Sequence, residues 1–290
     1  MESLSKLHNK YYKHLLLFSV LLLVSSFVYL GFFYSQNNDF IYKDISLTGG
    51  TTVTITDNID AVKLKEDLNN KLEEMNTREI YDLITKEQKA LIIETKTDGE
   101  TAKLIFEEYL GYELTSENSS FEFTGSTLSE NFYKQLLIAI LFAFVFMGII
   151  VFILFRTFVP SVAVIISAFA DIIMTLVVVD LFGIKMSSAG IVAFLMLIGY
   201  SVDTDILLTT RLLKRSEGSL NQRIHGAFKT GMTMTLTSLM AVLVALLIVQ
   251  SFSIVLTQIF TILSIGLIFD MFNTWITNVS ILKWYMETKK

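Results

Sequence analysis

Four aspartates lie inside long apolar runs of this 290-residue chain: Asp171, Asp203, Asp205 and Asp270. A charged side chain at the centre of a bilayer costs about 3 kcal/mol even on insertion scales. Carboxyls therefore persist at such depth when they bind a proton, an ion or a partner helix. The pattern favours proton coupling, in which these four residues take up and release protons inside a membrane.

Three of these carboxyls are expected at similar depth. Counting ~1.5 Å per helical residue from the end of each run places Asp171, Asp203 and Asp270 about 12 to 20 Å deep, in the middle of a ~30 Å hydrocarbon core. Asp205 is expected nearer to the inner interface and Asp180 at the outer one. No Lys or Arg occupies the middle of an apolar run, so the neutral acid is favoured. The alternative is that the acids stay protonated and only join helices.

Asp203 and Asp205 must point in different directions. Residues two apart on an α-helix lie roughly 200° apart around its axis. We expect Asp203, the deeper residue, to face the interior of the helix bundle. Asp205 would then face the cytoplasmic side or a second subunit.

Polar residues on later apolar runs could support these acids. Thr233 and Thr237 share one helical face at i, i+4 spacing, although threonines often bond only to their own i−4 carbonyls. Asn273 and Asn278 are more informative, because amides are costly in lipid. Two glycines are expected to allow close helix packing. The candidate relay or supporting residues are Thr233, Thr237, Ser238 and Asn273; the packing glycines are Gly190 and Gly199.

The composition indicates a polytopic membrane protein. Hydrophobic residues make up 52% of the chain and the mean hydropathy is +0.56, which is too apolar for an ordinary soluble domain. The chain has no cysteine and three histidines, so we expect no disulfide, metal site or cofactor. Six runs are long enough to span a bilayer: His14–Tyr34, Gln135–Thr157, Pro160–Phe182, Ser188–Thr210, Met232–Ser251 and Ile254–Leu282.

Basic residues predict the orientation of the chain. If the six spans alternate, most basic residues outside the long segment between the first two spans fall on one side, which should be the cytoplasm. Residues 35–134 on the other side carry 10 basic and 20 acidic residues, an acidic balance that does not favour nucleic-acid binding. The expected cytoplasmic set is Lys6, Lys10, Lys13, Arg156, Arg211, Lys214, Arg215, Arg223, Lys229, Lys283, Lys289 and Lys290.

The predicted domains are therefore 1–34 (cytoplasmic N-terminus and first span), 35–134 (external domain) and 135–290 (five spans, with cytoplasmic loop 211–231 and a cytoplasmic C-terminus). The external domain reads as β-α-β-β-α-β, which is the ferredoxin-like α+β pattern. Its expected elements are a strand over Ile45–Thr56 bent at Gly49-Gly50, a helix capped by Asp57 or Asn58 that carries Ile59 to Met75, strands Glu79–Ile84 and Lys89–Thr95, a turn at Asp98-Gly99, a helix Thr101–Leu110 ended by Gly111, and a strand Ser120–Thr124.

Several motifs resemble the SecF family of the SecDF protein-export complex, within the RND transporter superfamily. The layout of one span, an external domain and five spans is similar along nearly the whole chain. Thr48-Gly49-Gly50-Thr51 resembles the family's external-domain signature, and Gly199-Tyr200-Ser201-Val202-Asp203-Thr204-Asp205 its fourth-span motif. Further similar motifs are Ala170-Asp171-Ile172-Ile173 and Thr237-Ser238-Leu239, and the archaeal-like form is suggested by Asp270-Met271-Phe272-Asn273-Thr274-Trp275.

The resemblance implies a membrane subunit that acts with SecD and uses the proton-motive force to help unfolded chains through the Sec channel. It implies a multi-pass protein of the cell membrane and no enzymatic activity. The bacterial fourth-span acid falls at Thr204 here, and a bacterial arginine expected near Thr233 is absent. A bacterial Asp–Arg pathway is therefore not expected.

Three other readings stay open. An RND-type half-transporter could move lipids or small hydrophobic molecules, although such exporters usually have twelve spans and this chain has six. An intramembrane aspartyl protease could use Asp203 and Asp270, but its Gly-x-Gly-Asp signature is absent. A scaffold would use the acids only to join helices.

Overall fold

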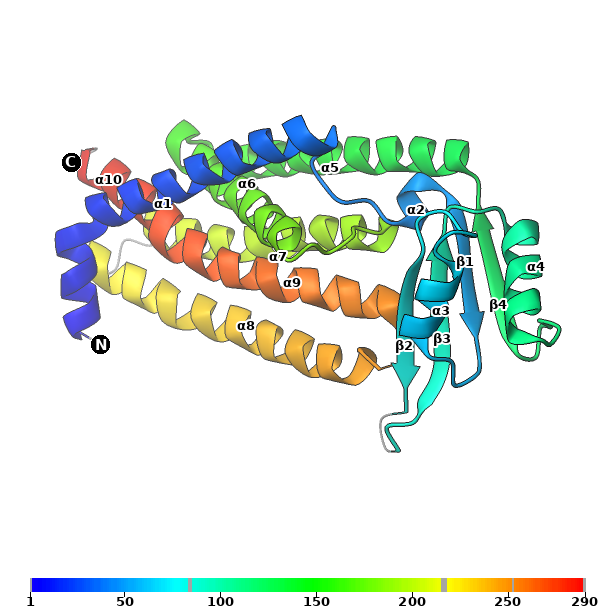
Figure 1. Ribbon diagram of the computed structural model, residues 1–290. Helices are drawn as coiled ribbons and strands as arrows, with labels where there is room; N and C mark the ends of the chain where they lie inside the picture. The colour runs from blue at the N-terminus through cyan, green and yellow to red at the C-terminus, as the bar shows by residue number, and fades with distance from the viewer. Residues whose placement is uncertain (1, 83–84, 215–217, 252, 289–290) are drawn as a thin grey trace.

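The computed structural model describes residues 2–82, 85–214, 218–251 and 253–288; the side chains of residues 2–11 and 127 are outside this description. Ile84, which we expected to end a strand, and the basic residues Arg215, Lys289 and Lys290 lie outside the described residues. A helical bundle occupies most of the molecule, and a sheet domain lies at one end of it (Figure 1). We call the end that carries the sheet domain the outer end.

Six helices of the described chain are long and apolar enough to cross a membrane, as predicted. Most extend beyond the predicted spans, because polar turns continue the helices past the apolar runs. The helices are α1 (Glu2–Asn37), α5 (Ser126–Phe155), α6 (Phe158–Leu181), α7 (Ser188–Leu213), α8 (Leu220–Val249) and α9 (Ile254–Phe272). The last of them continues through a π-helix, η1 (Asn273–Asn278), into α10 (Val279–Thr288).

Local chemistry explains where these helices begin and end. Arg156 adopts a left-handed conformation (φ +50°) and ends α5. Pro160 lies in the first turn of α6, where its missing N–H removes no helical hydrogen bond. Ser219 and Gln222 form a reciprocal capping box at the start of α8. The first turn of α1 and the last turn of α10 lie at the same end of the bundle, opposite the sheet domain (Figure 1).

The sheet domain has the predicted β-α-β-β-α-β order. Its four strands pair antiparallel in the order β2-β3-β1-β4, the arrangement expected of a ferredoxin-like α+β domain. Alternate residues such as Val53, Ile55, Leu91 and Ile93 are fully buried under the two helices. The elements are β1 (Gly50–Ile55), α3 (Ala61–Leu68), β2 (Asn76–Tyr81), β3 (Gln88–Thr95), α4 (Gly99–Leu110) and β4 (Ser119–Thr124).

Several predicted boundaries in this domain were wrong. Residues Ile45–Thr48 form a short helix, α2, because the Asp44 side chain accepts a hydrogen bond from the Ser46 N–H and caps it. Asp60, not Asp57 or Asn58, caps α3. Asp98 caps α4 directly instead of forming a turn before it. All three helices begin at an aspartate cap, and the sequence offers several aspartates and asparagines nearby that serve turns and caps equally well.

The predicted helix also ends early. α3 stops at Leu68, although Leu72 and Met75 beyond it are still buried in the same core. Buried residues therefore continue at roughly helical spacing after the helix has ended. The hydrophobic periodicity alone could not show whether these later residues belong to the helix or to the loop that follows it.

One side of the sheet domain is tied to the bundle by backbone contacts. Lys43 and Met186 form an isolated parallel β-bridge, in which the Met186 N–H donates to the Tyr42 carbonyl at 2.5 Å and the Asp44 N–H to the Met186 carbonyl at 3.0 Å. Gly49 lies directly against the backbone of Ser126 at the start of α5. The domain is therefore anchored where the chain enters and leaves it.

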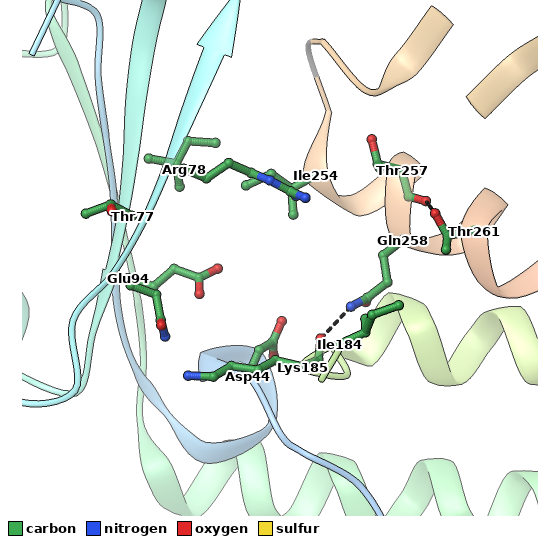
Figure 2. A pocket seen from close by; sticks show the side chains of 12 residues that line it. Asp44, Thr77, Arg78, Glu94, Ile184, Lys185, Ile254, Thr257, Gln258 and Thr261 are labelled. Carbon is green, nitrogen blue, oxygen red and sulfur yellow. Dashed lines mark hydrogen bonds between the residues drawn. The ribbon is translucent and has the colours of Figure 1, made fainter. Parts of the chain in front are cut away.

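On the other side of the sheet domain, a cavity of about 280 Å³ that is lined mainly by polar residues separates the domain from the bundle. Figure 2 shows Arg78 and Glu94 pointing from the helix-free face of the sheet toward Lys185 and Gln258 of the bundle. Burial raises the pKa of Glu94, the Asp44 carboxylate raises it further, and Lys185 and Arg78 oppose the rise. This side of the domain faces the bundle across a charged gap instead of a packed interface.

We expect Gly49→Ala to lower the melting temperature of the full chain more than Gly111→Ala. Both glycines have positive φ, +85° and +76°, where a non-glycine residue costs about 1–3 kcal/mol. A Cβ at Gly49 would also overlap the Ser126 backbone, whereas nothing lies within 4 Å of that position at Gly111. Thermal unfolding of the two variants in the same detergent measures the difference, and equal losses would contradict a close contact at Gly49.

Candidate functional site

Three carboxyl groups meet in the middle of the bundle. Asp171 of α6, Asp205 of α7 and Asp270 of α9 are each 0% exposed. They come from three helices that pack against one another. The bundle thus brings together three of the four predicted acids, and Asp203 is the exception.

Asp171 is held from two sides. The Ser201 hydroxyl donates to Asp171 Oδ2 at 2.5 Å, and Asn273 Nδ2 donates to Oδ1 at 2.8 Å. Asn273 Oδ1 in turn accepts a hydrogen bond from Thr277 Oγ1 at 2.9 Å, and Thr277 is hydrogen-bonded to Ser19 of α1. A continuous polar chain therefore connects Asp171 to the first helix.

Asp205 receives all its hydrogen bonds on one oxygen. Asn278 Nδ2, Thr274 Oγ1 and Ser167 Oγ donate to Asp205 Oδ1 at 2.7, 2.8 and 3.3 Å. Asp205 Oδ2 is buried and has no hydrogen-bond partner among the described residues. No donor reaches Oδ2, so an ionised Asp205 would leave a charged, buried oxygen without a hydrogen bond, which costs more than a neutral oxygen in the same place. The geometry therefore favours the neutral acid, and a proton on Oδ2 would also have no acceptor among the described residues.

Asp270 is joined to Asp205 through a shared hydroxyl. Thr274 Oγ1 lies 3.3 Å from Asp270 Oδ1 as well as 2.8 Å from Asp205 Oδ1. Thr235 of α8 contacts Asp270 Oδ2 at 3.4 Å and Thr204 at 3.4 Å. A hydroxyl has one proton to donate, so Thr274 can donate to only one of these two acids at a time, and the other acid can bond to it only when it is protonated and donates.

The π-helix explains how one helix reaches two acids. Residues five apart lie about 140° apart around an α-helix, so Asn273 and Asn278 would face different neighbours. In η1 the backbone hydrogen bonds join residues five apart, which brings the two amides toward one face. Both donate to acids, Asn273 to Asp171 and Asn278 to Asp205.

A glycine on α8 makes room for this π-turn. A Cβ at Gly231 would overlap the ring of Trp275, which also packs edge-on against Phe228 with ring centroids 5.0 Å apart. α8 can therefore lie close enough to η1 for Thr235 to reach Asp270.

The predicted directions of the two fourth-span acids were wrong. Asp203 is exposed on the surface of α7, whereas Asp205 is buried with Ser201, Leu208 and Leu212. The spacing correctly placed the two acids on opposite faces, but depth does not determine which face turns inward. Here the inward face is the one that carries the buried residues at i, i+4, i+7 and i+11.

The threonine face predicted on α8 also points away from the acids. Thr233 and Thr237 are exposed and donate to the Lys229 and Thr233 carbonyls of their own helix, at 2.8 and 2.9 Å. Ser238 is half-buried. Asn273, by contrast, is 0% exposed and bonded to Asp171.

Several contributing residues were missed by the sequence analysis. They are hydroxyl residues: Ser167, Ser201 and Thr274, each one helical turn from an acid on its own helix, and Thr204 and Thr235, which meet each other across α7 and α8. The i, i+4 spacing of Ser167 and Asp171, Ser201 and Asp205, and Asp270 and Thr274 was an available signal.

The remaining predicted residues lie elsewhere. Gly49, Gly50 and Thr51 are in the sheet domain, where Thr51 Oγ1 donates to the Thr97 carbonyl at 2.6 Å. Gly199 faces outward with nothing within 4 Å of its Cβ position, so it is not a packing glycine in this chain.

Two further predictions had different outcomes. Gly190 packs closely, as predicted, against Met186 and Gln258. Asp180 is 4% exposed and its two oxygens lack hydrogen-bond partners among the described residues, so it is buried in the protein instead of lying in an open interface.

Comparison with known proteins gives consistent matches. The family described as "Protein export membrane protein SecD/SecF, C-terminal" matches residues 107–288. Protein-export membrane protein SecF of Methanocaldococcus jannaschii is 41% identical over 284 residues, which cover 96% of each chain. SecF of Methanolacinia petrolearia is 49% identical over 164 residues, 56% of this chain and 58% of the relative.

The fold also matches a solved structure. The crystal structure of SecDF, a translocon-associated membrane protein from Thermus thermophilus, superposes with a TM-score of 0.73 at 20% identity. The match covers 96% of this chain and 38% of the SecDF chain, so it concerns the fold of one part of that protein. Because a family match covers more than half of the chain and a relative is 41% identical along nearly its whole length, the chain belongs to the SecF family of protein-export membrane proteins.

Proposed function

We propose that this chain acts with SecD to help unfolded proteins through the Sec channel, and that the proton-motive force drives this action through Asp205. The observation that carries the proposal is the one-sided bonding of Asp205, with three donors on Oδ1 and none among the described residues on Oδ2. The chain would act as a translocation accessory of the cell membrane and not as an enzyme.

Loss of a proton from Asp205 would require the site to rearrange. The resulting carboxylate would carry charge on Oδ2, which has no donor among the described residues, and two of the donors on Oδ1, Thr274 and Asn278, belong to η1. A shift of η1 toward Oδ2 would also move Asn273 against Asp171, because the three residues lie on one short π-turn. Protonation of one acid is thereby linked to the contacts of another.

The same shift has a route to the sheet domain. Thr277 of η1 is hydrogen-bonded to Ser19 of α1, and α1 leads directly into the segment that anchors the domain. Moving one charge across 100 mV supplies ~2.3 kcal/mol. That is enough to change the ratio of two positions of the domain by roughly fifty-fold.

We assign the exposed face of α7 to SecD. Val192, Met196, Tyr200 and Asp203 are exposed at helical spacing on this helix, and an exposed carboxyl in a membrane span is costly without a partner. The SecDF chain is longer than the part matched here, which is consistent with a partner that covers this face. Two observations support cytoplasmic N- and C-termini. Basic residues concentrate on one side of the predicted spans, and the first turn of α1 and the last turn of α10 lie at the same end of the bundle.

Asp205→Asn should abolish the stimulation of export by a proton gradient, while the protein still inserts and assembles with SecD. Asparagine keeps the donors on Oδ1 but cannot exchange a proton. The measurement is translocation of a secretory protein into reconstituted vesicles that contain SecD and the Sec channel, with proton and sodium gradients collapsed separately. Asp180→Asn, at another buried acid of a membrane span that has no hydrogen bond to the site among the described residues, is the matched control and should keep most of the stimulation. Full stimulation in Asp205→Asn would exclude this residue as the coupling acid.

Photo-crosslinking should identify the α7 face as the SecD contact. A benzophenone amino acid at Met196 or Tyr200 should yield an adduct with SecD, because both side chains are exposed on this face. The same amino acid at Leu141 or Ile150, which are exposed on α5, should yield none. Adducts from α5 but not from α7 would place SecD on the other side of the bundle.

A further inference from the structure

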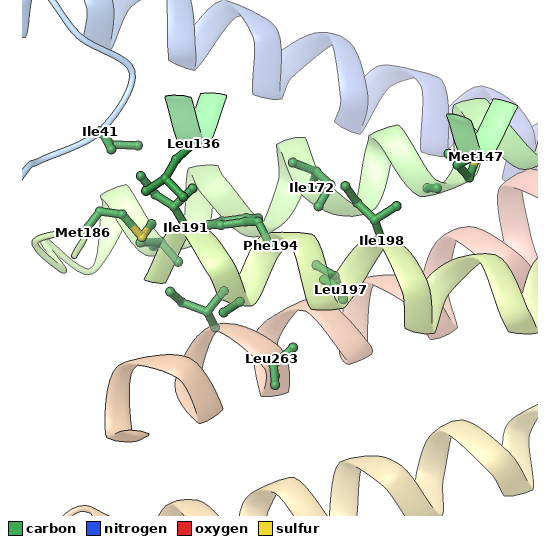
Figure 3. Close-up of a cluster of buried hydrophobic side chains, with 14 of the residues drawn as sticks. Ile41, Leu136, Met147, Ile172, Met186, Ile191, Phe194, Leu197, Ile198 and Leu263 are labelled. Carbon is green, nitrogen blue, oxygen red and sulfur yellow. The ribbon is translucent and has the colours of Figure 1, made fainter. Parts of the chain in front are cut away.

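An apolar groove of about 440 Å³ opens between α1 and α5 near the outer end of the bundle. Phe27 and Gly31 of α1 form one wall, and Leu137 and Ile140 of α5 form the other. Its floor includes Ile172, Met186, Ile191 and Phe194, which Figure 3 shows converging from α6, α7 and the loop between them. None of the three buried acids lines this groove.

Gly31 is one reason that the groove exists. It lies between the bulky residues Leu30 and Phe32 in the interior of α1, where glycine costs about 1 kcal/mol relative to alanine. Glycines in membrane helices commonly allow a neighbouring helix to approach. Nothing lies within 4 Å of the Cβ position of Gly31, so this glycine leaves open space instead of a close contact.

The lining selects a hydrocarbon ligand. Among the described residues that line the groove, Tyr133 has the one polar side chain, and its hydroxyl already donates to Asp39 at 2.9 Å. A peptide backbone or a water cluster would find few hydrogen-bonding partners there. From Tyr133 to Ile140 the groove extends about 10 Å along α5, roughly two-thirds of one leaflet of a ~30 Å hydrocarbon core.

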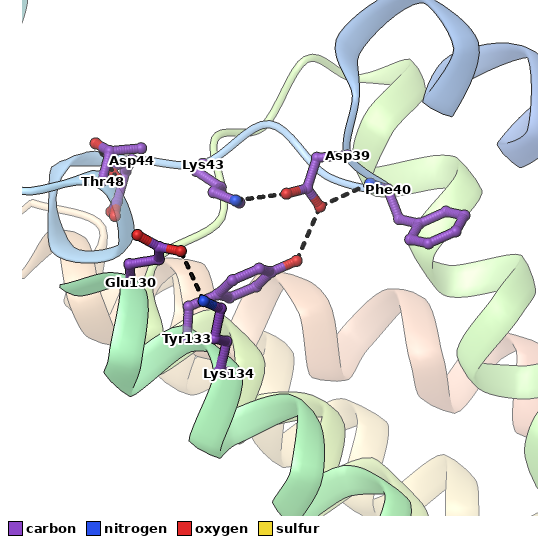
Figure 4. A network of polar contacts seen from close by, with 8 residues as sticks. All are labelled: Asp39, Phe40, Lys43, Asp44, Thr48, Glu130, Tyr133 and Lys134. Atoms are coloured by element: carbon purple, nitrogen blue, oxygen red, sulfur yellow. Dashed lines mark hydrogen bonds and ion pairs between the residues drawn. The ribbon is translucent and has the colours of Figure 1, made fainter. Parts of the chain in front are cut away.

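A cation lies beside the outer mouth of the groove. Figure 4 shows Lys43 next to Tyr133 and Asp39; its Nζ lies 4.2 Å from the Tyr133 ring centroid and 2.5 Å from Asp39 Oδ2. An ammonium group has three donors, so Lys43 can bind a phosphate oxygen as well as Asp39. Because Lys43 is paired with Asp39, the mouth offers hydrogen-bond donors and not a net positive charge. An apolar slot below such donors matches the hydrocarbon chain and the polar headgroup of a phospholipid.

We propose that this groove binds one hydrocarbon chain of a membrane phospholipid, with the phosphate held beside Lys43. The lipid fills the space between the two helices that connect the sheet domain to the bundle. It supports their relative position without a direct helix contact, so the connection between domain and bundle includes a lipid.

The test uses the full chain purified in a mild detergent with dioleoyl phosphatidylglycerol, some of it carrying a diazirine in the acyl chain. Native mass spectrometry should show a retained lipid, and crosslinks should fall on Leu137, Ile140 or Ile173. Gly31→Phe should reduce both signals at least tenfold, because the ring fills the groove. Val28→Phe, on the same helix at a position 68% exposed, is the matched control and should leave both unchanged.

A second pair of variants fills the groove from the opposite wall. Leu137→Trp should have the effect of Gly31→Phe, and Leu141→Trp, one turn further along α5 and outside the lining, should have none. Lys43→Gln should weaken retention of the phosphatidylglycerol relative to diolein, which lacks the phosphate. Equal crosslinking in filled and control variants would overturn the proposal. So would a photoreactive amino acid at Leu137 that, in membranes, captures a protein helix instead of lipid.

Discussion

A carboxyl group inside a bilayer has no water to bond, so neighbouring helices must supply its partners. In this chain that requirement holds α6, α7 and α9 in one arrangement, because each acid takes donors from helices other than its own. Asp171 is bonded from α7 and η1, Asp205 from α6 and η1, and Asp270 from α8 as well as from Thr274 of η1. Hydroxyls and amides carry out this role here, and they do not cancel a charge. The packing of the bundle is therefore sensitive to whether each acid holds its proton.

The sheet domain is attached to the bundle unevenly. It is anchored by backbone contacts around Met186 and Gly49, while its helix-free face is separated from the bundle by a polar cavity with Glu94 on one side and Lys185 on the other. An interface that is tight on one side and open on the other permits rotation about the tight side. Glu94 and Lys185 attract each other across this gap, whereas Arg78 beside Glu94 carries the same charge as Lys185.

Much of this architecture could be predicted from the sequence. Six apolar runs gave six helices, and the β-α-β-β-α-β order gave the antiparallel sheet, because hydrophobic periodicity reflects burial directly.

The sequence did not allow us to predict which way the side chains of a helix point within the bundle. Asp203 and Asp205 differ in which face of α7 they occupy, and that depends on neighbours far along the chain. Thr235, rather than Thr233 or Thr237, reaches the acids because Gly231 sets the approach of α8 to Trp275. The cap of α3 was placed at Asp57 or Asn58 instead of Asp60, and Asp98 was interpreted as part of a turn instead of a cap, since aspartate serves turns and helix starts equally well.

The π-turn at Asn273–Asn278 has a consequence for the end of the chain. Relative to an uninterrupted α-helix, a turn with wider hydrogen bonding behaves as an insertion of one amino acid, and one amino acid corresponds to about 100° of helical phase. The π-turn therefore determines which way the side chains of α10 point around the helix axis. Glu287 is one of them, and it accepts a hydrogen bond from the Tyr12 hydroxyl of α1. A single-residue deletion within the turn would restore ideal geometry locally and, in doing so, swing the whole C-terminal helix out of register with the N-terminal one.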